Sequence, residues 1–565
     1  MLKGCVSWPE QAAARYREQG YWADFTLNQM LARSIQRQPD KIALVHNERR
    51  MTYRELGESI AQLAVRFAES GLQPRDRVVL QLTNGIEFII VFFALLRIGV
   101  IPVLALPAYR HREVSHFIAH SGAVAYIAPE RVRDFDYRVM ASDIAARLPT
   151  LHTVYILGEP IEGQRSLTDL LSSPHVADAA GRLRDFAPAP DDVALMLMSG
   201  GTTGVPKLIP RTHNDYVYNC RQSAAVAGFD ADTVFLALLP MAHNYTLGSP
   251  GVLGALAWGG TCVIAPDAAP ETICRMIEQE HVTVVSAAMP LVVSLLNSNA
   301  PEAYDLRSLK VFMSGGAKLA PELRRQVEQR FKCIYQESFG TAEGLLNMTR
   351  LDDPKEIRLT SSGRPISPGD EIKVVDERGH ELPEGEVGEL VCRGPYTVRG
   401  YYNAPEATGA TYTEDGFYRM GDAVRKIGSD LYVEGRLKDL INRGGEKISC
   451  EEVENHLLAH AKIKNACVVA MPDKVFGERA CAFVILRGNS DLSFEELKNF
   501  LLGRDIAKFK LPERLEIVHE FPISAAGKIL RRELRDIIAE RIATEQTASN
   551  KTAPAAQVMS CLWTT

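Results

Sequence analysis

The stretch Met198-Ser-Gly-Gly-Thr-Thr-Gly-Val-Pro-Lys207 follows directly on the apolar run Val193-Ala-Leu-Met-Leu. Three glycines let the backbone approach a ligand closely, while hydroxyls and free N–H groups can donate to phosphate oxygens. The pattern therefore predicts a loop that binds a nucleotide triphosphate. It is not a Walker A motif, because Leu208 stands where a Ser or Thr would hold Mg²⁺. A P-loop kinase is disfavoured.

Around this loop, helical stretches alternate with short β-rich runs such as Arg77-Val-Val-Leu-Gln-Leu and Thr261-Cys-Val-Ile-Ala. This alternation predicts α/β architecture with buried strands. From Gly369 to Tyr432, short alternating strands with Gly, Pro and Asp turns predict a β-rich subdomain. We therefore expect an α/β multi-subdomain fold, in which residues 1–435 form a large N-terminal domain of two α/β subdomains plus the β-rich one.

A second, smaller domain is predicted after the basic segment that begins at Arg436. Helix is expected at about 450–459, strands at 466–470 and 480–486, and another helix at 493–503. This pattern predicts a small mobile α+β domain over residues 440–543, joined by a hinge at 436–439. Residues 544–565 are rich in Thr, Ala, Ser and Gln and are predicted to be a disordered tail.

Composition excludes several classes of protein. The 565 residues are 46% apolar and 24% charged, and the net charge of −6 without a long basic block argues against nucleic-acid binding. The most apolar stretch, residues 88–96, is too short to span a bilayer and predicts a buried helix. No secretory signal is evident near the start, so we expect a cytoplasmic protein. The ten scattered cysteines predict reduced thiols.

Four further stretches follow the loop in order: Ser338-Phe-Gly-Thr-Ala-Glu343, Tyr418-Arg-Met-Gly-Asp422, Gly435-Arg-Leu-Lys-Asp439 and Ala526-Gly-Lys-Ile-Leu-Arg531. Together with the loop, they resemble the ordered motifs of the adenylate-forming superfamily of acyl-CoA synthetases, luciferases and nonribosomal-peptide adenylation domains. The resemblance covers the chain to about residue 540. It implies an enzyme that forms an acyl-AMP from ATP and a carboxylic acid.

The resemblance also implies a role for each matching residue. Two anions, a carboxylate and the α-phosphate, must meet, so cations and hydrogen-bond donors are needed rather than a covalent nucleophile. Lys528 would lie between the two, Glu343 would bind Mg²⁺, and Lys438 would serve as the hinge. The small domain would rotate after adenylation and withdraw Lys528. The residues implied to bind ATP or AMP are Ser199, Gly200, Gly201, Thr202, Thr203, Gly204, Lys207, Gly316, Phe339, Gly340, Asp422 and Arg436.

Longer stretches, including Trp8-Pro-Glu, Met241-Ala-His-Asn-Tyr and Ser314-Gly-Gly-Ala-Lys-Leu, are most similar to the stand-alone 2,3-dihydroxybenzoate:AMP ligases of siderophore biosynthesis. By that resemblance, His243 stands as a gate beside the substrate carboxylate and is counted with the catalytic residues. The residues implied to bind the aryl acid are Asn244 at the ring 2-hydroxyl, Tyr245 against the ring, Ser249 at the 3-hydroxyl, Gly315 in a flat loop with Gly316 and Ala317, and Ser338 in the pocket wall.

Two departures keep the substrate open. Ser338 stands where the dihydroxybenzoate enzymes carry a small apolar residue, and Thr-Leu-Gly follows Tyr245 in place of Pro-Leu-Ser. Salicylate and 3-hydroxypicolinate therefore remain alternatives to 2,3-dihydroxybenzoate. The expected partner is a separate phosphopantetheinylated aryl carrier protein, with no nucleic acid and no membrane. An aryl-CoA synthetase is the alternative enzyme, and a scaffold that binds aryl acid or nucleotide is the alternative outside catalysis.

Overall fold

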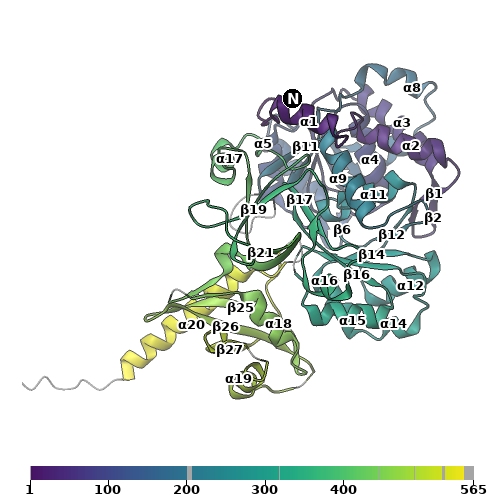
Figure 1. The fold of residues 1–565 in the computed structure, drawn as a ribbon. Helices are drawn as coiled ribbons and strands as arrows, with labels where there is room; N and C mark the ends of the chain where they lie inside the picture. The colour runs from purple at the N-terminus through teal and green to yellow at the C-terminus, as the bar shows by residue number, and fades with distance from the viewer. Residues whose placement is uncertain are drawn as a thin grey trace, which may run out of the picture. The chain divides into compact units, whose positions relative to one another are not determined.

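The chain divides into two compact units in a computed structural model that describes residues 2–199, 206–316, 318–444, 446–488, 490–504, 506–524 and 528–552. The first unit ends at Val433 and the second begins at Glu434. Figure 1 shows the α/β organisation of the first unit and the smaller α+β second unit. The predicted fold class is confirmed.

The largest sheet of the first unit has nine strands in the order β18-β17-β16-β15-β14-β12-β13-β1-β2. Its central pairs are parallel, and the pairs at both edges are antiparallel. Helices α15 (Pro321–Phe331) and α16 (Lys355–Thr360) pack beside β16 (Figure 1). The strands are β1 (Ile42–His46), β2 (Arg49–Thr52), β12 (Val234–Ala237), β13 (Thr261–Ile264), β14 (Val284–Ala287), β15 (Val311–Gly315), β16 (Ile334–Thr341), β17 (Gly344–Met348) and β18 (Arg364–Pro365).

A second sheet of seven strands has the order β11-β10-β4-β3-β5-β8-β9. Its central strands are almost wholly apolar because helices cover parallel strands on both faces. The buried helix predicted for residues 88–96 is confirmed as α4 (Ile86–Arg97). The strands are β3 (Arg77–Leu80), β4 (Ile101–Leu104), β5 (Ala125–Pro129), β8 (Thr153–Leu157), β9 (Arg165–Ser166), β10 (Val193–Met198) and β11 (Leu208–Thr212).

Several helices of the first unit begin at residues whose side chains cap them. Thr26, Thr52 and Thr212 each accept a hydrogen bond from the backbone three residues on, so a capping box starts α2, α3 and α9. Besides α4 and α15, the helices of this unit with eight or more residues include α1 (Glu10–Glu18), α2 (Leu27–Arg37), α3 (Tyr53–Glu69), α5 (His111–Ser121), α6 (Tyr137–Arg147), α9 (His213–Val226), α11 (Gly251–Trp258), α12 (Pro270–Glu280) and α13 (Met289–Asn297).

The predicted β-rich subdomain is an antiparallel sheet of four strands, β19 (Glu371–Val375), β20 (Val387–Arg393), β21 (Tyr418–Ile427) and β22 (Asp430–Arg436). One face packs on a cluster of buried side chains that includes Leu390, Tyr418 and Val433. A sheet with one covered face requires apolar and polar residues to alternate along its strands. This alternation is the signal from which the β-rich subdomain was predicted.

The second unit contains a five-stranded sheet with helices α18 (Cys450–Leu458), α19 (Phe494–Leu502) and α20 (Arg531–Thr552). The strands are β23 (Ile441–Arg443), β24 (Glu446–Ile448), β25 (Ile463–Asp473), β26 (Gly477–Leu486) and β27 (Arg514–Ile517). Helix α20 continues to Thr552, so the first part of the predicted disordered tail is helical. Among the described residues, no helix has the length and apolar character needed to cross a bilayer.

Candidate active site

The two arms of the predicted phosphate loop are the antiparallel strands β10 and β11 at the edge of the seven-stranded sheet. Ser199 N donates to Lys207 O at 3.0 Å, and Lys207 N donates to Ser199 Oγ at 2.9 Å. These two bonds join the described residues on the two sides of the loop and hold Ser199 beside Lys207. Gly200, Gly201, Thr202, Thr203 and Gly204 lie outside the described residues.

Glu343 lies in the turn between β16 and β17 and is 5% exposed. Its Oε1 accepts a hydrogen bond from the Tyr401 hydroxyl at 2.9 Å. The Lys207 ammonium lies 4.7 Å from the centroid of the same tyrosine ring. The structure thus brings together two predicted site residues, Lys207 and Glu343, through a tyrosine that the sequence analysis did not identify.

Tyr401 follows Arg399 and Gly400 in a polar segment, and nothing in that local pattern distinguishes its role from that of neighbouring Tyr402. Burial, and then the negative charge of Glu343, raise the pKa of the Tyr401 hydroxyl. It therefore remains protonated at neutral pH and acts as the donor to the carboxylate.

The predicted aryl-binding residues surround the short helix α10 (Asn244–Gly248). His243 caps this helix, since its Nδ1 accepts from Tyr245 N at 3.2 Å. Asn244 Oδ1 accepts from the Tyr216 hydroxyl at 2.8 Å, and Asn244 Nδ2 donates to Ser249 Oγ at 3.2 Å. Asn244 and Ser249 are therefore neighbours, and Tyr216 of α9 is a partner of Asn244 that the sequence did not indicate.

Gly315 and Ser338 are register partners at the ends of β15 and β16. A Cβ atom at Gly315 would lie 2.9 Å from both Tyr245 Cζ and Ser338 O. Only glycine allows the Tyr245 ring this close to the strand. Gly316 has φ +85°, a left-handed conformation that glycine adopts without strain, and Ala317 lies outside the described residues. Tyr245 joins the α10 group to the end of the sheet.

Strand β16 links the aryl group to the turn that carries Glu343. Beyond Ser338 the strand continues through Phe339 and Gly340, and a Cβ atom at Gly340 would lie 2.4 Å from Leu345 O. Phe339 O accepts from Asn347 Nδ2 at 3.3 Å, which secures the strand to β17. One strand thus carries both ends of the candidate site.

A buried arginine ties the loop hairpin to the same turn. Arg211 of β11 pairs with Asp215 at 2.6 Å, and neither side chain is exposed. Its Nη1 donates to Ala342 O at 2.9 Å, and its Nη2 donates to Tyr396 O at 3.1 Å. These bonds hold the arm of the phosphate loop next to Glu343.

The predicted ribose ligand Asp422 is buried in β21. Burial and then the charges of Asp370, Glu343 and Asp422 raise the pKa of the Cys392 thiol. The thiol therefore stays protonated at neutral pH, and the role of Asp422 at the ribose stays a prediction.

Three predicted residues belong to the second unit. Arg436 ends β22, and Lys438 lies in the 3₁₀ turn Leu437–Asp439; both are exposed. The Lys528 backbone forms two hydrogen bonds with Ser524, from Lys528 N to Ser524 Oγ at 3.1 Å and from Ser524 N to Lys528 O at 2.7 Å. These bonds hold the Lys528 backbone beside Ser524, ahead of α20.

A carboxylate such as Glu343 suits Mg²⁺, which usually takes one or two protein carboxylates and completes its shell with substrate phosphates and water. Within the part of the chain that the structure describes, no three His, Cys, Asp or Glu side chains gather as a metal cluster. The Tyr401 hydroxyl bonds one of the two oxygens of Glu343. The donor set therefore fits a metal that is shared with a nucleotide better than a metal held by protein alone.

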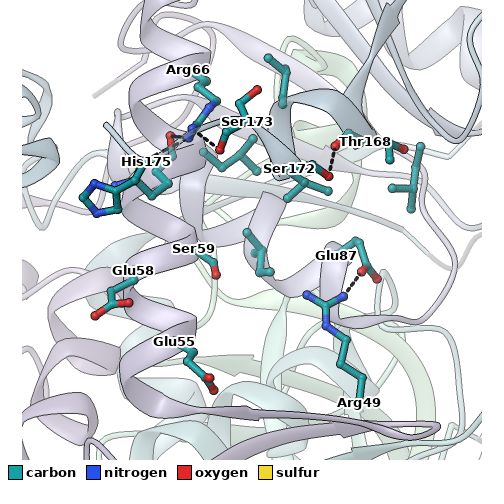
Figure 2. A pocket seen from close by; sticks show the side chains of 16 residues that line it. Arg49, Glu55, Glu58, Ser59, Arg66, Glu87, Thr168, Ser172, Ser173 and His175 are labelled. Atoms are coloured by element: carbon teal, nitrogen blue, oxygen red, sulfur yellow. Dashed lines mark hydrogen bonds and ion pairs between the residues drawn. The ribbon is translucent and has the colours of Figure 1, made fainter. Parts of the chain in front are cut away.

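A cavity of about 420 Å³ lies between α3, α4 and α7 (Leu167–Ser172), and none of the predicted site residues line it. Figure 2 shows the side chains that line this cavity. Both arginines that line it already have protein partners. Arg49 pairs with Glu87 at 2.5 Å, and Arg66 donates to Ser173 O at 3.0 Å. The candidate site is instead the set of residues along β10, β11, β16 and α10.

The family model for AMP-binding enzymes matches residues 31–402, and the model for the AMP-binding enzyme C-terminal domain matches residues 452–528. The 2,3-dihydroxybenzoate-AMP ligase of Bacillus subtilis (strain 168) is 45% identical over 544 residues, which are 96% of this chain and 99% of that protein. A salicylyl-CoA synthase / salicylate adenylyltransferase of a Streptomyces species is 43% identical, over 95% of this chain and 98% of its own length. Apo MbtA of Mycobacterium smegmatis has a TM-score of 0.72 at 39% identity, over 94% and 98% of the two chains.

Proposed function

Because this chain belongs to the AMP-binding enzyme family, we propose that it activates an ortho-hydroxy aromatic acid, with 2,3-dihydroxybenzoate as first candidate, for siderophore or related nonribosomal peptide biosynthesis. A carboxylate oxygen of the acid bonds to the α-phosphorus of ATP, and the bond from that phosphorus to the pyrophosphate oxygen breaks. The thiol of a phosphopantetheinylated carrier protein then bonds to the acyl carbon, loses its proton and releases AMP.

The observation that carries this proposal is the continuity of two groups along β16. At one end Asn244 and Tyr245 lie beside Gly315 and would receive the aryl ring, and at the other end Lys207 and Glu343 both contact Tyr401. A carboxylate bound at the first group would point toward phosphates bound at the second. Holding the two reactants in such a geometry is the main requirement of the first half-reaction.

At the phosphate end, the ammonium of Lys207 and the hydroxyl of Ser199 would hold the β- and γ-phosphates. Glu343 would hold Mg²⁺, which neutralises phosphate charge when it is bound. Asp422 would accept hydrogen bonds from the two ribose hydroxyls. Lys528 would supply positive charge to the reacting carboxylate and α-phosphate, where negative charge increases in the transition state.

At the aryl end, polar groups favour an acid with ring hydroxyls. Ser249 Oγ accepts from Asn244 Nδ2 at 3.2 Å and from Asn219 Nδ2 at 3.3 Å, so its own proton can be donated to a ring substituent. An acid without an acceptor there would leave a buried hydroxyl unpaired and would bind less tightly. Salicylate is the second candidate, because the Streptomyces relative is named for it.

The test is exchange of labelled pyrophosphate into ATP with 2,3-dihydroxybenzoate, salicylate, 3-hydroxypicolinate, benzoate and a fatty acid. We expect exchange with an ortho-hydroxy acid and a loss of about 100-fold or more in Lys528→Ala. Lys464→Ala, an exposed lysine on β25 of the same unit, is the control and should match the wild type. Exchange with no acid would refute the enzymatic proposal and favour the binding scaffold.

A second assay addresses the acceptor. Preformed aryl-AMP on the enzyme is offered a phosphopantetheinylated aryl carrier protein or free coenzyme A, and the thioester is identified by mass. Transfer to the carrier alone supports the proposal. Equal or faster transfer to coenzyme A would favour the aryl-CoA synthetase.

A further inference from the structure

Residues 395–402, which we call the bridging segment, connect β20 to the helix α17 (Pro405–Thr411). The segment contacts both the phosphate-loop hairpin and the turn of Glu343. Its hydrogen bonds to these elements include Arg211 Nη2 to Tyr396 O at 3.1 Å, Leu345 N to Thr397 Oγ1 at 3.4 Å, Val398 N to Glu343 O at 2.7 Å and Tyr402 N to Leu208 O at 2.9 Å. The backbone of the segment therefore sets the distance between hairpin and turn.

Tyr401 is the residue of this segment whose side chain contacts both Glu343 and Lys207. It is 4% exposed, and its backbone N–H donates to Thr408 Oγ1 at 3.0 Å, which secures it against α17. Its hydroxyl donates to Glu343 Oε1 at 2.9 Å, and its ring lies under the Lys207 ammonium at 4.7 Å. A ring held this way is a rigid reference point for two flexible side chains.

Resting on the function proposed above, we propose that Tyr401 is a positioning residue for the metal–nucleotide end of the site. Its hydroxyl holds Oε1 of Glu343, so that Oε2 is directed to Mg²⁺ bound on the phosphates. Its ring holds the Lys207 ammonium by a cation–π contact.

The hydroxyl matters because Glu343 is one carboxylate acting without a surrounding cluster of acidic side chains among the described residues. A metal site with so few protein ligands depends on the orientation of each. Hydrogen bonds that orient metal ligands are typically worth 10–100-fold in metal affinity or activity.

The first variant is Tyr401→Phe, which removes the hydroxyl and keeps the ring. We expect the Mg²⁺ concentration for half-maximal exchange to rise about tenfold. Calorimetry gives a readout without turnover: the affinity for ATP with Mg²⁺ should fall by a similar factor, while the affinity for ATP with EDTA stays within about twofold because the Lys207 contact with the ring remains.

Tyr412→Phe is the matched control. The Tyr412 ring lies 6.3 Å from the Tyr401 ring and is half-buried, and its buried hydroxyl makes no hydrogen bond within the described part of the chain. It should leave the Mg²⁺ dependence unchanged. Thermal melts of both variants separate a loss of folding from a loss of positioning.

Two further variants test the route of the effect. In a Glu343→Gln background, Tyr401→Phe should change the Mg²⁺ dependence by less than about twofold, because both changes act on one interaction. Tyr401→Leu should additionally weaken binding of metal-free ATP by about threefold or more, because the ring under Lys207 is lost.

Wild-type Mg²⁺ dependence in Tyr401→Phe, or an equal effect in both Glu343 backgrounds, would overturn the proposal. Failure of the wild type to exchange with any aryl acid would instead count against the proposed function. In that event the calorimetric comparison with and without Mg²⁺ still decides the role of Tyr401.

Discussion

Replacing Arg211 by methionine should destabilise the first unit and loosen the phosphate-loop hairpin. The guanidinium is fully buried and donates to Asp215, to Ala342 O and to Tyr396 O. Methionine fills part of the volume and supplies none of these donors. The Asp215 carboxylate would then stay buried with only the bonds it accepts from Thr212, from N at 2.6 Å and Oγ1 at 2.8 Å.

The magnitude follows from the missing partner. Removing one member of a buried ion pair costs about 3–5 kcal/mol, since the other charge is left uncompensated. With a urea m-value of about 3 kcal/mol/M, this corresponds to a fall of about 1–1.7 M in the unfolding midpoint. The double variant Arg211→Met/Asp215→Asn carries no buried charge and keeps an acceptor for Thr212 N. It should recover a substantial part of the loss.

Urea unfolding followed by tryptophan fluorescence measures this effect, because Trp8, Trp22 and Trp258 all belong to the first unit. Arg54→Met is the control, since Arg54 and its partner Asp40 are 54% and 81% exposed and their pair is screened by water. A midpoint for Arg211→Met within about 0.3 M of the wild type would refute the reasoning. So would a double variant that is no more stable than the single one.

Two other substitutions test the packing of Gly315 against Tyr245 and the protonation of the buried Asp370. Gly315→Ala places a Cβ atom 2.9 Å from the Tyr245 ring. The KM for the aryl acid should therefore rise at least about tenfold, with little change in the KM for ATP. Gly409→Ala is the control, because a Cβ atom at this position of α17 meets no other atom within 4 Å. An unchanged KM would contradict the packing argument. Burial raises the pKa of Asp370 to about 8 although Tyr396 donates to it. The folded protein then holds a proton that the unfolded chain releases above about pH 4, so this residue lowers stability as pH rises from about 4 to 8. Asp370→Asn should therefore gain stability over the wild type from pH 5 to pH 8 in urea titrations, and a constant difference would show that Asp370 is ionised in the fold.

Much of the candidate site could be predicted from short motifs. Ser199 and Lys207 meet because β10 and β11 form a local hairpin. The turn residues of such a hairpin are neighbours in the sequence, so a short motif can indicate it. The pairing of Asn244 with Ser249 spans one short helix and is equally local. The extent of α20 was not predicted, because its last turns lack the apolar period that identifies a packed helix.

The sequence by itself determined the α/β class, the family and the order of the motifs, because periodicity and glycine-rich turns are properties of continuous stretches of chain. Only the tertiary structure decided that Tyr401 lies between Lys207 and Glu343, and that Arg211 joins β11 to the turn at Ala342 and to Tyr396. These bonds connect residues 58, 131 and 185 positions apart. Contacts at such separations depend on how strands from distant segments come together in the fold. The residues next to a tyrosine or an arginine in the sequence do not indicate which distant residue it will contact.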